Sequence, residues 1–191
     1  MGTTLAPTAD VAVQTWQIDR THTNVEFAVK HLMIANVKGH FEDVSGVLKG
    51  DFSNPGDFEL QITIGTASVD TRQAQRDAHL RSPDFFDSER WPEIRFVGRR
   101  VKGDVNGEFM LYGDVTIRDV TKELKFRVTN EGSVRDPWGG SRMGFSAKAR
   151  LDRRDFGLLY NQALETGGFV VGDEIRISID AEFTAVPAEL T

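Results

Sequence analysis

Apolar and polar residues alternate along most of this chain, and this period of two is the feature that most limits its possible folds. In the stretch 24–31, Val25, Phe27 and Val29 share one phase, and most of the residues between them are polar. Such alternation is typical of a β-strand with one buried face and one wetted face. The pattern recurs, with some gaps, over residues 37–41, 44–52, 58–64, 94–98, 109–117, 124–128, 145–151 and 175–183. The sequence therefore predicts eight or nine strands.

The connections between these strands are mostly hairpin-like, which favours an antiparallel sandwich or barrel. Five glycines fall inside predicted strands, where they suit the bends and bulges of a strongly curved sheet. They are Gly39, Gly46, Gly50, Gly98 and Gly113. Curvature favours the barrel, so the predicted fold class is all-β: an antiparallel β-barrel of about eight strands with a short inserted helix.

One charged segment breaks the alternation and predicts the inserted helix, at residues 71–81. Asp70 is suited to cap its first turn, with Gln73 three residues later to reciprocate. Asp77 and Arg81 are four residues apart with the acid first, which is a favourable ion pair on a helix. We therefore expect a short charged helix with a capped start and a salt bridge between Asp77 and Arg81.

The aromatic residues after this helix suggest a cover for one mouth of the barrel. Ser82 and Pro83 are expected to end the helix, because a residue before proline avoids the α conformation. Phe85, Phe86 and Trp91 follow within a few residues. Two interpretations stay open: a lid over a container, or a plug that packs into a filled core.

Length and charge limit the domain organisation and the partners. With 191 residues, 39% of them hydrophobic, the chain is long enough for one domain with a substantial core. The predicted boundaries are a flexible tail at 1–14, one barrel domain at 15–186 and a short tail at 187–191. The net charge of −6 argues against nucleic acid as a partner, because phosphates bind basic surfaces. Basic segments at 99–102 and 153–155 are interpreted as solvated or ion-paired strand ends.

Features of the chain that bear on its location are mostly negative. No apolar run approaches the roughly 20 residues of a membrane-spanning helix, so no integral membrane segment is expected. The N-terminus lacks the basic and apolar regions of a secretory signal peptide. The expected location is cytoplasmic, with the periplasm as the alternative if the chain is a processed form. The absence of cysteine excludes disulfides and thiolate metal sites.

The four histidines do not form a convincing metal or catalytic set. His22, His31 and His40 are equally spaced, but strand parity sends His31 inward and His40 outward, so they cannot converge on one ion. A site from His22, His79 and a carboxylate remains an open alternative. No G-x-S-x-G elbow and no phosphate-binding loop occurs. We predict no metal, no cofactor and no enzymatic activity.

Several segments together resemble the YceI-like family. They are WQIDRTHTNVEFAVKHL from Trp16, VKGHF from Val37, ASVDT from Ala67, RDAHLRSPDFFD from Arg76, WPEIRF from Trp91, YGDVTIRDVTK from Tyr112, DRRDFGL from Asp152 and VGDEIRI from Val171. The chain departs from the family pattern at residues 33–36, after His31 and Leu32, and at Asp119. The resemblance implies a lipocalin-like barrel that binds a polyisoprenoid or other long-chain lipid. Whether the barrel forms a homodimer stays open.

The resemblance and the alternation together define a candidate site inside the barrel. The implied function is a non-catalytic carrier of a long-chain apolar lipid such as an isoprenoid quinone or its precursor, or a fatty-acid-type lipid. The predicted lipid-binding residues are Val25, Phe27, Val29, His31, Phe41, Ile62, Ile64, Phe86, Phe96, Leu111, Val115, Phe126 and Phe145. His31 would meet a polar head group or satisfy a buried carbonyl. Two alternatives stay open: an enzyme on a lipid head group with His31 or His79 as general base, and a filled barrel that serves as an interaction module.

Overall fold

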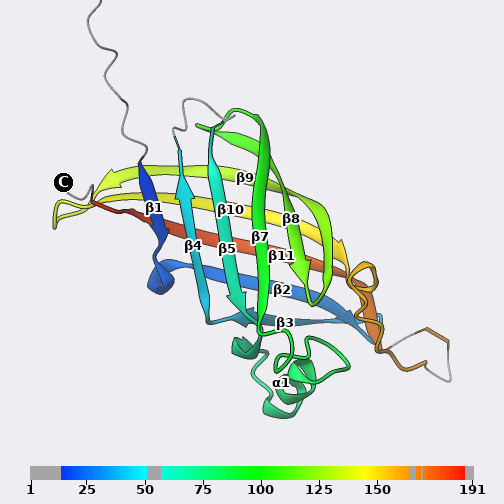
Figure 1. The fold of residues 1–191 in the computed structure, drawn as a ribbon. Coiled ribbons are helices and arrows are strands. Elements are labelled where there is room, and N and C mark those ends of the chain that lie inside the picture. The colour runs from blue at the N-terminus through cyan, green and yellow to red at the C-terminus, as the bar shows by residue number, and fades with distance from the viewer. Residues whose placement is uncertain (1–13, 51–56, 164–166, 169, 188–191) are drawn as a thin grey trace, which may run out of the picture.

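The protein is built on one antiparallel sheet of eleven strands, as a computed structural model shows for residues 14–50, 57–163, 167–168 and 170–187 (Figure 1). The strands are β1 (Thr15–Ile18), β2 (Asn24–His31), β3 (Ala35–Phe41), β4 (Val44–Lys49), β5 (Glu59–Gly65), β6 (Val69–Asp70), β7 (Glu93–Gly103), β8 (Glu108–Ile117), β9 (Val120–Arg135), β10 (Ser141–Asp152) and β11 (Val171–Ala185). One α-helix, α1 (Ala74–Arg81), is inserted between β6 and β7. The predicted tails lie outside the described residues, apart from Gln14 and Pro187.

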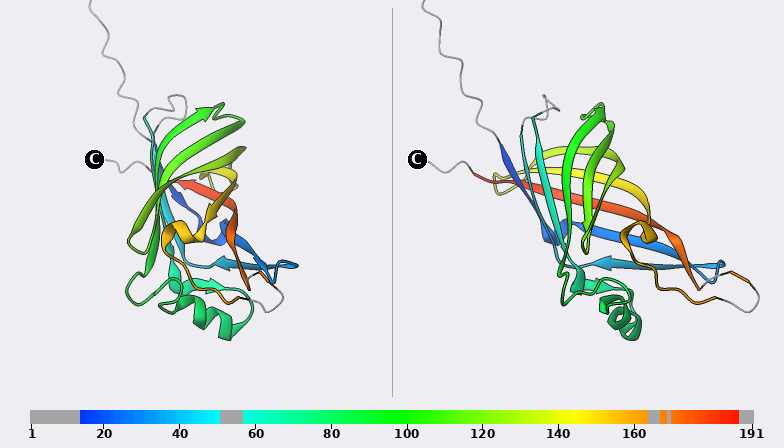
Figure 2. Two further views of the ribbon diagram at one scale, coloured as in Figure 1. Left: turned by 90° about the vertical axis from the view of Figure 1, so that its right-hand side faces the viewer. Right: turned by 45° about the vertical axis from the view of Figure 1, so that its right-hand side comes forward.

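Eight of these strands close into a ring. The order is β1-β4-β5-β7-β8-β9-β10-β11, and β11 pairs back onto β1 through Trp16–Ala185 and Ile18–Phe183. Strand β11 has a second partner on the same edge, because its earlier residues pair with β2. From β2 the sheet continues through β3 to the short β6 (Figure 2). The predicted eight-stranded antiparallel barrel with a short helix is confirmed.

The apolar phase of each strand faces the barrel interior, as the alternation predicts. Three ladders are interrupted by bulges: β7–β8 between Gly98 and Arg100, β9–β10 between Gly144 and Phe145, and β2–β11 between Val171 and Ile175. Gly113 has a different role, because a Cβ atom there would overlap the ring of Phe96. The glycines of the strands thus provide room for inward aromatic rings as well as curvature.

Helix α1 begins later than predicted. Gln73 is its N-cap and accepts a hydrogen bond from the Arg76 backbone N–H, whereas Asp70 accepts from the Arg72 N–H at 2.6 Å. Asp70 is therefore part of a local turn ahead of the helix. The helix ends at Ser82 as predicted.

The predicted ion pair between Asp77 and Arg81 is wrong. Asp77 is buried, and its carboxylate accepts hydrogen bonds from the backbone N–H and the hydroxyl of Thr71. Arg81 donates instead to the carbonyls of Ala67 and Val69 at 2.7 and 2.8 Å. Both side chains therefore tie the helix to the segment around β6, because buried backbone groups need partners more than an exposed ion pair does.

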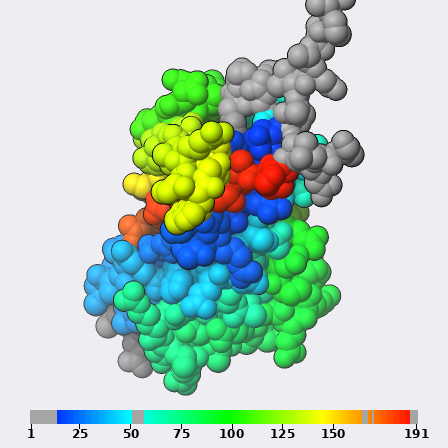
Figure 3. Space-filling model, turned by 90° about the vertical axis from the view of Figure 1, so that its left-hand side faces the viewer, coloured from blue at the N-terminus to red at the C-terminus, as the bar shows by residue number. Residues whose placement is uncertain are grey.

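Helix α1 and the segment after it cover one end of the barrel, where they pack against β3 (Figures 1 and 3). Phe86 contacts Phe41 of β3, with ring centroids 5.7 Å apart. Phe85 is buried, but Trp91 is only partly buried and lies under the Arg90 guanidinium. No helix among the described residues is long and apolar enough to cross a membrane.

Candidate functional site

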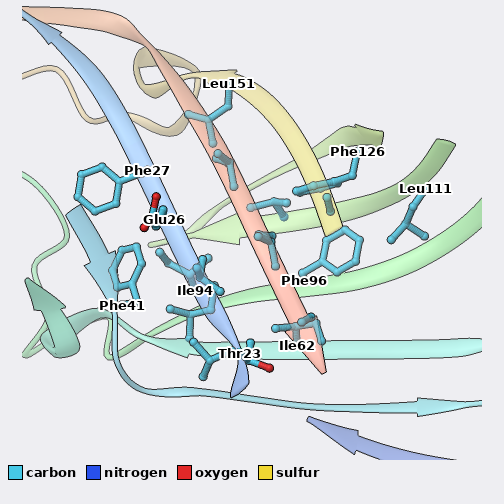
Figure 4. A pocket seen from close by; sticks show the side chains of 18 of the residues that line it. Thr23, Glu26, Phe27, Phe41, Ile62, Ile94, Phe96, Leu111, Phe126 and Leu151 are labelled. Atoms are coloured by element: carbon cyan, nitrogen blue, oxygen red, sulfur yellow. The ribbon is translucent and has the colours of Figure 1, made fainter. Parts of the chain in front are cut away.

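The barrel encloses an apolar cavity of about 270 Å³. Its wall is formed by side chains from β2, β3, β4, β5, β7, β8, β9, β10, β11 and the α1 segment (Figure 4). Ten of the thirteen phenylalanines in the chain line this space. Every lining residue is apolar except Thr23, Glu26 and Arg153. The cavity is therefore suited to an apolar ligand.

The register of the sheet explains why these side chains meet. Ile62 of β5 pairs with Phe96 of β7, and Phe96 pairs with Val115 of β8. Residues paired across neighbouring strands point to the same face of the sheet. Their side chains therefore lie next to one another in the wall of the cavity. The rings of Phe96 and Phe126 lie edge-to-face with centroids 5.2 Å apart, which is a favourable aromatic geometry.

Eleven of the thirteen residues predicted for the site line the cavity. They are Val25, Phe27, Phe41, Ile62, Ile64, Phe86, Phe96, Leu111, Val115, Phe126 and Phe145. Val29 and His31, the other two residues predicted to bind lipid, do not line it, and their contact with a lipid stays a prediction. Both lie where β2 and β3 run on as a hairpin, and a bulge between Val171 and Ile175 interrupts the ladder with β11 there. Strand β2 therefore extends beyond the end of the cavity, and the alternation of inward and outward side chains does not show where the cavity ends.

The structure adds lining residues that the sequence did not single out. Phe58, Phe109 and Phe183 share the inward phase of their strands and extend the cavity along the barrel axis. The alternation of apolar and polar residues is sufficient to predict that these three side chains face inward. Leu80 of α1 and Val105 of the β7–β8 turn also line it, and no periodic pattern marks residues in a helix or turn that fold over a barrel end.

Each of the three polar lining residues makes hydrogen bonds within the protein. Thr23 Oγ1 is within 3.1 Å of the Glu182 backbone N–H, and Glu26 Oε1 accepts from Asn24 Nδ2 at 3.1 Å. Arg153 is 2% exposed and follows β10 in a 3₁₀ turn, η3 (Arg153–Phe156). These residues therefore complete the wall with their carbon atoms and backbone.

Arg153 is the one buried guanidinium at this end of the cavity among the described residues. It donates to the carbonyls of Leu158, Tyr160, Gly172 and Val171, and its Nη2 lies 2.9 Å from Asp173 Oδ1. Burial lowers the pKa of Arg153, and the Asp173 carboxylate opposes that effect. The side chain thus closes the barrel end by joining η3 to the start of β11.

The histidines lie apart from one another, as parity predicts for His31 and His40. His79 Nε2 is 2.8 Å from Asp84 Oδ2 and contacts the rings of Phe85 and Tyr160. It does not line the cavity, and neither do His22, His31 and His40. No histidine therefore lines the cavity.

Two groups among the described residues bring a histidine and two carboxylates close enough to share an ion: Asp19, His22 and Glu182, and His40, Glu42 and Asp70. In the first, Arg142 already neutralises the acids, with Nη1 2.9 Å from Asp19 Oδ2 and a further contact to Glu182. The hydrogen bond from His22, and then that from Arg142, lower the pKa of Asp19 to about 2. In the second, the His40 ring is 3.9 Å from each carboxylate on the outer face of β3.

Known proteins match both the sequence and this architecture. The model of the YceI-like domain family matches residues 16–183. A UPF0312 protein of Staphylococcus aureus is 35% identical over 167 residues, which cover 87% of this chain and 95% of the relative. The crystal structure of the Campylobacter jejuni YCEI protein is 32% identical with a TM-score of 0.67, and the match covers 80% of this chain and 87% of that one.

Two more distant structures share the fold. Burkholderia cenocepacia BcnA matches with a TM-score of 0.74 at 20% identity, over 86% of this chain and 98% of that one. A domain from Saccharophagus degradans, described as polyisoprenoid binding, matches with a TM-score of 0.66 at 14% identity, over 90% of this chain and 98% of that one. With the family match over nearly the whole barrel, this chain belongs to the YceI-like domain family.

Proposed function

We propose that the protein is a non-catalytic carrier that holds a long-chain apolar lipid of the polyisoprenoid class in its barrel. The observation that carries this proposal is the enclosed apolar cavity, whose wall presents phenylalanine rings and aliphatic side chains. The related domain from Saccharophagus degradans is described as polyisoprenoid binding, which supports the class of ligand. An isoprenoid quinone or its precursor, or a fatty-acid-type lipid, fits the same chemistry.

Burial of the chain is sufficient to drive binding. Each methylene removed from water contributes about 0.8 kcal/mol, so about 20 methylenes give roughly 16 kcal/mol before the costs of ordering and desolvation. A cavity of about 270 Å³ is at the small end for a ligand pocket. The histidines face elsewhere, which favours a carrier over an enzyme.

The decisive variant is Ile64→Phe, which enlarges a wall residue and keeps it apolar. We expect the variant to fold and to bind a C20 polyisoprenol at least about tenfold more weakly, because overpacking removes space that the ligand needs. Native mass spectrometry of the freshly purified protein measures the co-purified lipid, and titration of the delipidated protein with geranylgeraniol measures affinity.

Gln61→Phe is the matched control, because Gln61 lies on the same strand but is exposed on its outer face. His31→Gln is a second control outside the wall. Both are expected to keep the wild-type lipid load. Equal loads in Ile64→Phe and wild type would show that the lipid does not occupy this cavity.

A further inference from the structure

The outer face of the barrel carries a groove of about 780 Å³ that concentrates positive charge in a chain of net charge −6. Its lining contains one acidic residue, Glu26, and six basic residues, all of them exposed. The basic residues are Lys38, Lys125, Arg127, Lys148, Arg150 and Arg176. The charge of the molecule is thus strongly asymmetric.

The register of the sheet aligns these basic side chains. Arg176 of β11 pairs with Arg150 of β10, and Lys148 of β10 pairs with Arg127 of β9. Arg176 donates to Asn36 Oδ1 at 2.7 Å, and Arg150 lies 3.4 Å from Glu174. Like charges on directly opposed positions repel each other. An anionic surface that lies against these paired basic side chains would offset their mutual repulsion.

A second feature adjoins the groove. The β2–β3 hairpin projects beyond the barrel ring (Figure 2), and its turn exposes three consecutive apolar residues. Leu32, Met33 and Ile34 are 37%, 61% and 83% exposed. Asn36, which lies in the groove, is two residues from this turn. The apolar turn therefore lies at one end of the basic groove.

The turn also has a backbone that its residues do not favour. The Ile34 N–H donates to the His31 carbonyl, and Leu32 and Met33 between them have φ of 50° and 62°. Asparagine and glycine are the residues suited to such a turn. Large apolar residues are thus held in a strained conformation and exposed to water, an arrangement that a partner with an apolar layer would relieve.

We infer that this face docks on an anionic phospholipid bilayer, with the hairpin turn inserted at the interface and the basic groove over the head groups. Interfacial binding of this kind combines a buried apolar segment with basic residues near anionic lipid. From Met33 to Lys38 the chain spans at most about 17 Å at the rise of a strand, which is short enough for both parts to reach one surface. The inference concerns the outer surface and does not depend on the cargo.

Flotation with vesicles tests the inference. We expect the protein to float with vesicles of phosphatidylcholine and phosphatidylglycerol, to float far less with phosphatidylcholine alone, and to lose binding as salt screens the charges. The double variant Arg127→Glu/Lys148→Glu should bind the mixed vesicles at least about tenfold more weakly. Ile34→Asp, or the milder Met33→Gln, should weaken binding to a similar degree.

Two matched controls change the same chemistry elsewhere. Arg95→Glu reverses an exposed charge on β7, and Trp138→Asp removes an 85% exposed aromatic at the β9–β10 turn. Both should bind like wild type, and all variants should keep the wild-type lipid load. The inference is overturned if the controls lose binding as the test variants do, if phosphatidylcholine alone binds equally well, or if an anionic oligonucleotide binds while vesicles do not.

Discussion

At the scale of single residues, Arg153 shows how one side chain can hold a barrel end together. Its guanidinium is 2% exposed and reaches four carbonyls and one carboxylate. A planar fork with five N–H groups can make these contacts at once, and an ammonium cannot. The residue acts on the cavity by positioning the η3 segment and the start of β11.

Arg153→Lys should lower the free energy of unfolding by about 3 kcal/mol, because it leaves buried carbonyls without donors. Urea titration followed by circular dichroism measures this. Arg154→Lys is the control: Arg154 is 60% exposed and 3.7 Å from Asp173, so the change should be within about 0.5 kcal/mol. Equal stability of the two variants would mean that the buried network contributes little.

This residue also marks a limit of sequence analysis. Segment 153–155 was interpreted as a solvated or ion-paired strand end, and Arg154 fits that description. Its neighbour Arg153 is buried because carbonyls from the segment after η3 and from the start of β11 fold around it. Those partners are up to 20 residues away in the sequence, and no local pattern predicts which arginine they will select.

At the scale of elements, the exposed turn of the β2–β3 hairpin lowers the stability of the protein. Leu32 and Met33 adopt positive φ, which costs about 1–2 kcal/mol for each residue other than glycine. The alternation predicted both strands correctly, since it reports which face is buried. It does not show where the cavity stops along them, so Val29 and His31 are predicted to bind lipid although they lie beyond the residues that line the cavity.

Replacing the turn by Leu32→Asn and Met33→Gly should raise the free energy of unfolding by about 1 kcal/mol, because these residues suit the observed backbone. Thermal unfolding measures the gain. The same variant should float less with anionic vesicles, since it loses the apolar turn. An Ile34→Ser change, which removes apolar area without altering the strained residues, should weaken flotation without the gain in stability. A double variant that is no more stable than wild type would contradict the assignment of strain.

At the scale of the whole molecule, ring closure depends on a short seam. Strand β1 has four residues, and three of its pairs with β11 complete the barrel. Arg142 reinforces the seam: it contacts Asp19 after β1, Glu182 of β11 and Asp136 of the β9–β10 turn. The pKa of Asp136 is lowered and that of Arg142 is raised by these contacts.

The seam should make stability depend on acid pH. Because the pKa of Asp19 falls from 3.8 to about 2 on folding, its contribution is complete above about pH 4 and is lost as the pH falls through 2. We expect this contribution to be about 1 kcal/mol, since the His22 side of the pair is open to solvent. Between pH 5 and pH 2, the midpoint temperature of thermal unfolding should fall less in Asp19→Asn than in wild type. An equal fall in both proteins would show that the pKa of Asp19 does not change on folding.

The fold as a whole is predictable because every strand of a closed sheet alternates inward apolar residues with outward polar ones. Inward apolar residues such as Phe96 and Phe126 follow from parity alone. The helix start and its ion pair were not predictable, because Asp77 is drawn to Thr71 by burial. Contacts between distant segments decide such details.

The apolar wall has a consequence for the biology of its cargo. A wall made almost entirely of apolar side chains would select a bound chain by its length and cross-section more than by its functional groups. Two hydrocarbons of equal size would then compete only through their abundance. If the protein is a lipid carrier as we propose, the composition of the membrane from which it loads would then set its cargo, and the same protein would carry different molecules as that composition changes.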